Sequence, residues 1–401
     1  MPAMRFVLGL GFVAGLADIV YEGARSMYGP FLGALGASAL VVSLVTGGGE
    51  AVALVLRLIF GKAADMQSRR WPLAITGYAL TVVAVPLLGL TKTLWIACVL
   101  ILLERLGKAV RSPSKDAMLA QAGTGPGRGW AFGVHEALDQ TGAFLGPLVV
   151  AAAFALTATF AAGYLVLAIP GIAALSLLVW LRRRVPDVGV YEPEPAHDAE
   201  AASNQPLPGA FWIYLLFTSL VMTGFATFGL LSFHLSTRGL VPIALVPVVY
   251  AAAMAVDAGA ALLSGRWYDR VGISGLVLLP LLAAAVPWLG FSSTAALAVV
   301  GVLVWGAAMG VQESTMRAAV ADLVPNARRG SAYGLFTAAY GAAWLLGSLL
   351  IGLLYEHSVV VTAAVVTAVE VVALLVFAWL KPHRRHREHI RSSASRPDAE
   401  E

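Results

Sequence analysis

Charged residues are scarce in this sequence. They make up 12% of 401 residues, against about 25% in a typical soluble domain. Apolar residues make up 59%, so the side chains that would cover a water-exposed surface are missing and a soluble globular chain is excluded. Apolar runs of about 20 residues, enough to cross a hydrocarbon core about 30 Å thick, recur almost without pause. The sequence predicts an integral membrane protein.

Other features are missing too. Cys98 is the single cysteine, which excludes a disulfide framework or a cysteine metal cluster. No glycine-rich phosphate loop ending in Lys-Ser/Thr is present, so ATP is not the evident energy source. No nucleophile–base arrangement is evident, and we expect no enzyme, no cofactor and no nucleic-acid partner. The first apolar run contains Asp18, Glu22 and Arg25, so we do not expect a cleaved signal peptide.

Hydropathy predicts twelve spans. They cover roughly residues 5–33, 38–61, 72–91, 94–117, 129–155, 160–181, 210–235, 242–264, 273–291, 294–322, 330–354 and 359–380. A proline-rich and acidic break divides the chain into an N-terminal bundle (1–181), a flexible linker (182–208) and a C-terminal bundle (209–380), followed by a basic tail (381–401).

The placement of basic residues predicts the orientation. Loops after even-numbered spans are basic, as in Arg182-Arg183-Arg184, whereas loops after odd-numbered spans carry only Lys92 and Arg238. By the positive-inside rule, both termini and the linker are expected in the cytoplasm.

The two halves repeat weakly. Gly61-Lys-Ala-Ala-Asp65, followed by Arg69 and Arg70, has a shorter copy in Gly265-Arg-Trp-Tyr-Asp269-Arg270. Gly146 and Gly347 fall at equal offsets within Arg-Gly segments that open spans five and eleven. Such repeats are typical of transporters built from two related bundles around a central cavity.

These motifs resemble those of the major facilitator superfamily. The Gly61–Arg70 loop resembles its cytoplasmic signature, Arg105 sits where its exporters keep a membrane arginine, and Gly142 to Pro147 is similar to the span-five motif of its proton-driven antiporters. A closer resemblance is to a prokaryotic subgroup with Asp18, Glu22 and Glu50, and with Arg-Ser-Pro-Ser-Lys-Asp-Ala after span four. The resemblance implies an all-α membrane protein of two pseudo-symmetric six-helix bundles, in a prokaryotic cytoplasmic membrane.

Membrane-embedded charges are the candidate functional residues, because each costs about 2.5–3.5 kcal/mol at a helix centre. Asp18, Glu22 and Arg25 share one helix face, and so do Glu50 and Arg57. We expect a site for protons or substrate made of Asp18, Glu22, Glu50, Arg105, His135, Glu136, Asp139 and Asp257.

Other charged residues are interpreted as locks between or within helices. Their spacing favours a Glu104–Lys108 pair with Arg111 one turn on, and a Glu313–Arg317 pair. Arg105 is expected to point away from Glu104. Arg25 and Arg57 complete the set of helix locks.

Two motifs suggest mechanics. In the Gly61–Arg70 loop, Asp65 could cap a neighbouring span while Arg69 and Arg70 pair with acids, which would latch the cytoplasmic side in one state. Gly142 and Gly146 permit close helix packing, and Pro147 adds a kink.

The preferred interpretation is a proton-coupled antiporter, acting as a monomer, that exports a small amphipathic organic molecule by alternating access. Aromatic residues of the second half, including Tyr250, Tyr340 and Trp344, suit an apolar or mixed substrate. The alternative is a divalent transition-metal exporter that uses Asp18, Glu22, Glu50, His135 and Asp139 as ligands.

Overall fold

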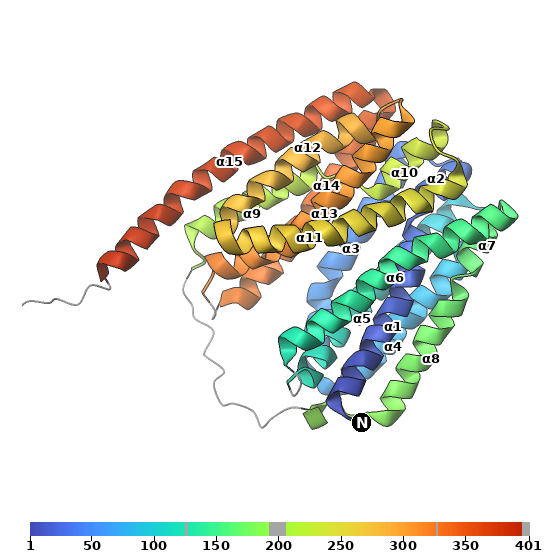
Figure 1. Ribbon diagram of the computed structural model, residues 1–401, viewed down its shortest axis with the longest axis horizontal. Helices are drawn as coiled ribbons and strands as arrows, with labels where there is room; N and C mark the ends of the chain where they lie inside the picture. Colours follow the sequence, from blue (N-terminus) through green and yellow to red (C-terminus); the bar gives the residue numbers. More distant parts are fainter. Residues whose placement is uncertain (125–126, 192–205, 326–327, 395–401) are drawn as a thin grey trace, which may run out of the picture.

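The computed structural model describes residues 1–124, 127–191, 206–325 and 328–394, and it is all-helical in this part of the chain (Figure 1). The first half holds α1 (Ala3–Arg25), α2 (Tyr28–Ala34), α3 (Ala39–Ala64), α4 (Gln67–Leu88), α5 (Leu94–Ala122), α6 (Arg128–Thr157), α7 (Phe160–Leu165), α8 (Ala168–Arg184) and the short η1 (Val188–Tyr191). The second holds α9 (Gly209–Thr223), α10 (Phe228–Thr237), η2 (Ile243–Leu245), α11 (Val246–Val271), η3 (Gly272–Val277), α12 (Leu278–Gly290), α13 (Ala295–Leu323), α14 (Arg329–His357) and α15 (Val359–Ala394).

These helices account for the twelve expected spans, so the predicted fold class is confirmed. Among the described residues, ten helical segments are long and apolar enough to cross a membrane. One of them, Ile243–Gly290, contains two spans, while α5 is absent from the ten; its many charged residues offset its apolar ones. Large apolar side chains face outward, such as Leu156, which is 86% exposed, as expected for a surface covered by lipid.

Three spans are broken, which hydropathy did not predict. Proline explains two breaks, because its ring nitrogen cannot donate to the carbonyl four residues earlier. Pro30 cannot donate to the backbone carbonyl of Ser26, and the helix breaks there between α1 and α2. Pro170 likewise cannot donate to the backbone carbonyl of Val166, between α7 and α8. Between α9 and α10 the chain unwinds after Gly224, and the Thr227 hydroxyl caps the new helix at Leu230 N, 3.4 Å away.

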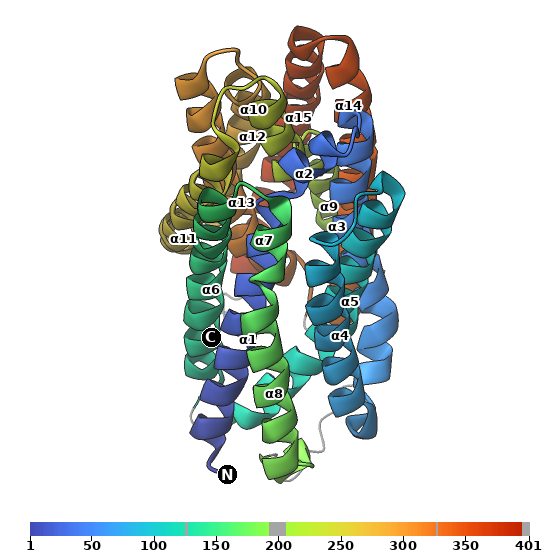
Figure 2. The same cartoon turned by 90° about the vertical axis from the view of Figure 1, so that its right-hand side faces the viewer.

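The helices form two bundles whose axes diverge toward one side (Figures 1 and 2). The N-terminus and the ends of α8 and α15 lie on that side, while α2, α7 and α10 lie on the opposite side. Within the first bundle α1 packs on α6 and α8; across the bundles α2 packs on α10, α3 on α14, and α6 on α11.

The side that carries α2 and α10 is tightly closed. A β-carbon added at Gly29 in α2 would lie 2.2 Å from the carbonyl oxygen of Gly229 in α10, so these backbones touch. The hydroxyls of Thr46 and Thr227 lie 2.9 Å apart across the same boundary. These contacts leave any cavity between the bundles to open toward the other side.

The predicted domain boundaries differ from the helix ends. Helix α8 continues through Arg184, into the expected linker, and α15 continues to Ala394, into the expected tail. Residues 192–205, which hold most of the expected linker, and residues 395–401 lie outside the described residues.

Candidate functional site

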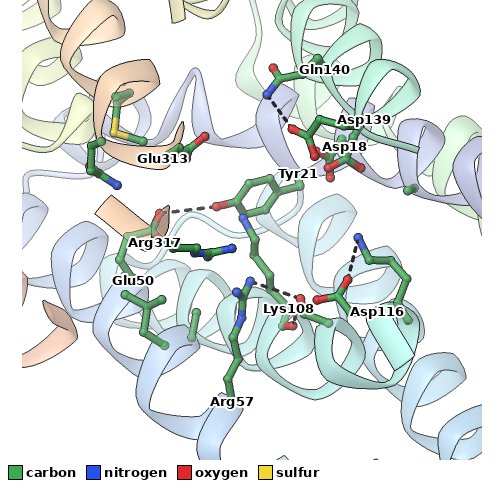
Figure 3. A pocket seen from close by; sticks show the side chains of 18 of the residues that line it. Asp18, Tyr21, Glu50, Arg57, Lys108, Asp116, Asp139, Gln140, Glu313 and Arg317 are labelled. Carbon is green, nitrogen blue, oxygen red and sulfur yellow. Dashed lines mark hydrogen bonds and ion pairs between the residues drawn. The ribbon is translucent and has the colours of Figure 1, made fainter. Parts of the chain in front are cut away.

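A cavity of about 640 Å³ lies between the two bundles (Figure 3). Helices α1, α3, α5 and α6 of the first half supply most of its charged lining, and α11, α13 and α14 of the second half close it. Its lining extends from the middle of α1 to Arg57 and Lys115, in the C-terminal halves of α3 and α5. The cavity is rich in ionisable groups.

Five side chains, four of them buried, form a continuous ion-pair chain, Glu22–Arg25–Glu50–Arg105–Glu104. Arg25 lies 3.5 Å from Glu22 and 3.3 Å from Glu50. Arg105 lies 2.9 Å from the same Glu50 oxygen, and its Nε lies 3.3 Å from Glu104. Acids and bases alternate along the chain, which connects the cavity wall to the interior of the first bundle.

Glycine makes room for this chain. A β-carbon at Gly49 would lie 2.7 Å from Cγ of Arg105. Arg105 can therefore pass beside α3 and reach Glu50, the next residue. Gly47 on the same helix faces Ser348 of α14, where a β-carbon would lie 1.9 Å from the serine hydroxyl oxygen. The Gly47-Gly48-Gly49 run thus serves packing both within the first half and between the halves.

Three tyrosines complete the ion-pair chain. Tyr21 donates to Glu50 at 3.4 Å and accepts from Arg105. Tyr28 donates to Glu104 at 3.4 Å. Tyr250, from the second half, donates to Glu22 and so connects the two bundles through their charged centre. These roles of the three tyrosines were not predicted from the sequence. For Tyr21, its spacing from Asp18 and Arg25 on the same helix was the available signal.

The structure corrects the lock predicted in span four. Glu104 is fully buried and pairs with Arg105 and Tyr28 rather than with Lys108. Lys108 instead lines the cavity, with Nζ 3.8 Å from the centre of the Tyr21 ring. The reason is that Glu104 faces the bundle interior while Lys108, one turn on, faces the cavity.

Arg105 also differs from its prediction. Its long side chain reaches back to Glu104, although the two residues leave the helix in different directions. It is 1% exposed and is not among the residues that line the main cavity. Glu50 stands between it and the cavity, so Arg105 contacts the site through that carboxylate.

Two further arginines of the first half hold hydroxyl groups. Arg57 donates to Ser112 at 3.3 Å, and Arg111 donates to Thr81 at 2.7 Å. Both arginines line the cavity. Arg111 therefore connects α5 to α4 rather than to Glu104.

The second half contributes fewer charges than the prediction assigned to it. Glu313 and Arg317 line the cavity, and in the described part of the chain no salt bridge joins them. Asp257 is 4% exposed and is absent from the cavity lining. It packs against Gly310 of α13, where a β-carbon would lie 2.9 Å from its Oδ1, so its role in the site stays a prediction.

Aromatic residues divide between the cavity and the core. Tyr340 and Trp344 line the cavity. Tyr250 and Trp305 are fully buried and pack against Phe228 with tilted rings. Only a part of the aromatic set named from the sequence therefore lines the cavity.

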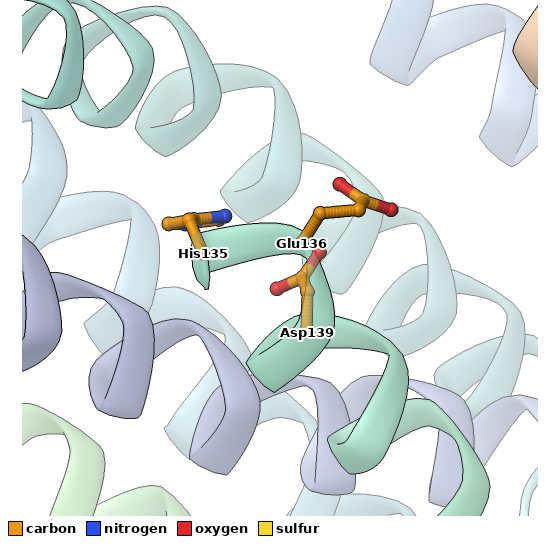
Figure 4. A group of neighbouring side chains, drawn as sticks. All are labelled: His135, Glu136 and Asp139. Atoms are coloured by element: carbon orange, nitrogen blue, oxygen red, sulfur yellow. The ribbon is translucent and has the colours of Figure 1, made fainter. Parts of the chain in front are cut away.

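His135, Glu136 and Asp139 come together on α6 (Figure 4). One potential ligand atom from each lies within 4.8 Å of the others. The Nε2 atom of His135 is buried and has no hydrogen-bond partner, and Figure 3 shows Asp18 beside Asp139. The larger predicted metal set is not assembled, because arginines and Tyr250 hold Glu22 and Glu50.

The predicted loop latch has no counterpart among the described contacts. Asp65 ends α3, and Arg70 donates from Nε to the carbonyl of Ala64 at 2.9 Å. Arg70 therefore caps its own loop, and Arg69 is exposed. A latch in another conformation stays a prediction.

The glycines of span five lie against α1. A β-carbon would lie 2.1 Å from Gly15 O if added at Gly142, and 2.4 Å from Ile19 O if added at Gly146. Pro147 lies within the continuous helix α6. These contacts hold Asp139 close to Asp18.

Comparisons with known proteins agree with this architecture. The sequence matches the Major Facilitator Superfamily over residues 10–316 and 257–399. It is 52% identical to an uncharacterised protein of Mycobacterium tuberculosis over 379 residues, covering 94% of this chain and 93% of the relative. It is 25% identical to an uncharacterised MFS-type transporter of Methanocaldococcus jannaschii over 369 residues, covering 87% and 88%.

Solved structures show the same fold at low sequence identity. A nucleoside transporter, NupG, matches with a TM-score of 0.71 at 13% identity, covering 93% of this chain and 99% of that one. A POT family transporter in complex with 5-aminolevulinic acid matches with a TM-score of 0.75 at 13% identity, covering 94% and 96%. The chain therefore belongs to the major facilitator superfamily, a family of transporters rather than enzymes, as the sequence motifs predicted.

Proposed function

We propose that this transporter is a proton-coupled antiporter that exports a small amphipathic organic molecule. The observation that carries the proposal is the set of membrane-embedded carboxyls at the cavity: Glu22 and Glu50 in the ion-pair chain, and Asp18 and Asp139 without a salt bridge among the described residues. Acids within membrane spans are typical of proton relays.

Protonation would act through the ion-pair chain. Glu50 holds both Arg25 and Arg105, and a proton on its carboxyl would remove the charge that attracts them. Arg25 would then favour Glu22, which Tyr250 of the other half contacts. The proton would thereby change a contact that joins the two bundles.

Single amide replacements test the coupling. A growth screen of an expressing strain against toxic organic compounds first supplies a substrate, whose flux is then measured in proteoliposomes with an imposed pH gradient. We expect Asp18→Asn, Glu22→Gln, Glu50→Gln and Asp139→Asn to include variants that lose pH-driven flux. Asp187→Asn is the matched control, since Asp187 bonds Gln67 outside the cavity. Normal pH-driven flux in all four would refute the coupling.

We further propose that the protein sits in the cytoplasmic membrane as a monomer with both termini in the cytoplasm. The basic loops support this orientation, and the N-terminus and the end of α15 lie on one side of the molecule in Figure 1. The cavity then opens to the cytoplasm. Reporter fusions at either end, active only in the cytoplasm, should both be active.

A divalent-metal exporter is the second candidate, favoured by the convergence of His135, Glu136 and Asp139. Isothermal titration with Mn²⁺, Co²⁺ and Ni²⁺ tests it. Binding that His135→Ala abolishes would support metal transport, whereas absence of binding would exclude it at this cluster.

A further inference from the structure

The unpaired charges that the first half brings to the cavity are sorted by wall. Acids without a salt bridge in the described ranges come from α1 and α6: Asp18, Glu136 and Asp139. Cations without a salt bridge in those ranges come from α3 and α5: Arg57, Lys108 and Arg111. Helix α13 of the second half carries one charge of each sign, Glu313 and Arg317. In Figure 3, Asp18 and Asp139 lie on one side of the cavity, and Arg57 and Lys108 extend into it from the opposite side.

This separation contrasts with the ion-pair chain beside it. Within the chain, acids and bases contact one another at 2.9–3.5 Å. Across the cavity, in the described ranges, no salt bridge joins Asp18 or Asp139 to Arg57 or Lys108. Their field points from the α3–α5 wall toward the α1–α6 wall, and in a partly enclosed space it is screened less than at a surface.

Each wall has charged groups that are free to bind a solute. On the basic wall, Arg57 gives one nitrogen to Ser112 and its Nε has no partner. Lys108 rests on the face of the Tyr21 ring, which leaves its ammonium donors free of a carboxylate. On the acidic wall, Asp18 and Asp139 are side by side, an arrangement that a cationic group would stabilise.

A solute with a single charge would satisfy one wall and leave the other unpaired in a space of about 640 Å³. A solute with both charges would compensate both walls at once. The remaining lining includes Phe336, Tyr340 and Trp344, which can contact an apolar body between the charged ends.

We propose that the substrate is a zwitterion, with a protonated amine facing Asp18 and Asp139 and a carboxylate facing Arg57 and Lys108. The proposal rests on the transport function proposed above and names the substrate class for that cavity.

The test is binding of matched compounds to the purified transporter, followed by thermal unfolding. The zwitterionic probes are 4-aminobutanoate, 6-aminohexanoate, 8-aminooctanoate and alanyl-phenylalanine, each compared with its N-acetyl derivative (an anion) and its amide (a cation). We expect at least one zwitterion to raise the melting temperature, and masking either end to weaken its affinity at least tenfold. A mixture of acetate and ammonium, which supplies the two charges on separate molecules, should not raise the melting temperature as the zwitterion does.

Variants assign the two ends. Lys108→Gln should weaken binding of the zwitterion about tenfold while leaving the amide unchanged, since the amide has no carboxylate to lose. Asp139→Asn should weaken the zwitterion and leave the N-acetyl form unchanged. Arg182→Gln, at the end of α8 outside the cavity, is the control, and the melting temperature without compound verifies folding of each variant.

The outcomes separate this proposal from the transport function. Three results would refute the proposal of a zwitterionic substrate. They are equal binding of masked and unmasked forms, stabilisation by divalent metal alone, and no stabilisation by any zwitterion. If an N-acetyl or amide form instead showed pH-driven flux, the antiport function would survive without it. If a zwitterion bound but showed no flux in either direction, the antiport function would fail.

Discussion

Two arginines from different helices converge on Glu50. Arg25 and Arg105 both contact its Oε1 atom, and Arg105 is 1% exposed. Burying such charges is favourable only when each is paired, because the desolvation penalty is several kcal/mol per ion. Removing one partner therefore leaves an uncompensated charge in the protein interior.

Glu50→Gln should lower the stability of the protein. Removing one member of a buried pair typically costs about 3–5 kcal/mol, and Arg105 would keep only Glu104 as an acidic partner. The measurement is the free energy of unfolding in mild detergent. Adding Arg105→Met and Glu104→Gln to Glu50→Gln removes the buried charges that would be left unpaired and should restore part of the loss; a triple variant less stable than Glu50→Gln alone would contradict this account.

Glu370 presents the opposite case. It lies on α15, is 1% exposed, and neither of its carboxyl oxygens has a hydrogen-bond partner. A carboxylate there would have no compensation, so we expect the group to be uncharged. It packs against Gly224, where the span of α9 and α10 is broken.

Glu370→Gln should leave the melting temperature and transport nearly unchanged, because an amide resembles a neutral carboxyl in size and polarity. Glu370→Lys is the contrasting variant, which places a longer and fixed charge at Gly224 and should destabilise the protein strongly. A clear loss of transport in Glu370→Gln alone would show that its ionised form is used.

The sequence predicted which charged residues are energetically costly to place in a membrane, but not which of them form ion pairs with one another. The spacing of Asp18, Glu22 and Arg25 predicted a common face, because helix periodicity is a local property. Glu50 and Arg105 are 55 positions apart, and their pairing depends on how α3 packs against α5. The role of Tyr250 depends on the contact between bundles, which no local pattern specifies.

Among the elements, α1 and α6 are packed closely through glycine. Gly15, Gly142 and Gly146 bring the two backbones into contact. Small residues in such positions are typical of helix pairs in membranes. This contact sets the distance between Asp18 on α1 and Asp139 on α6.

Gly146→Ala should lower the melting temperature and weaken transport, because its β-carbon would lie 2.4 Å from the carbonyl oxygen of Ile19. Gly133→Ala on the same helix is the matched control, since a β-carbon there meets nothing within 4 Å. Equal melting temperatures for the two variants would show that α1 and α6 can separate at little cost.

Hydropathy predicted every span but not the breaks within them. A run of apolar residues is equally apolar whether or not its backbone is helical throughout. The breaks at α1–α2 and α7–α8 follow from Pro30 and Pro170, which were visible in the sequence. The break before α10 depends on Gly224 and the Thr227 cap, residues that also occur within intact helices.

In the whole molecule, the closed side is held by backbone contact between the bundles. Gly29 on α2 meets Gly229 on α10, and Glu356 of α14 accepts from the backbone N–H of Leu40 at the start of α3, at 3.0 Å. Alternating access requires these contacts to separate while the diverging ends approach.

Gly29→Ala should shift the population toward the state that is open on the α2–α10 side. Its β-carbon would lie 2.2 Å from Gly229 O, whereas at Gly48 the nearest atom is a flexible leucine methyl at 3.6 Å, which makes Gly48→Ala the control. Spin labels at Ser68 and Arg270, with Cys98 replaced, report the distance between the diverging ends. A shorter distance in Gly29→Ala is expected; an unchanged distribution would contradict the role of this contact.

The ion-pair chain has an electrical consequence. Its three carboxylates exceed its two guanidinium groups by one negative charge, so a single proton would make it neutral. A zwitterion carries no net charge, and exchanging one for an incoming proton would move one positive charge inward in each cycle. The membrane voltage, worth about 2.3 kcal/mol per charge at 100 mV, would then drive export even where the two sides have equal pH.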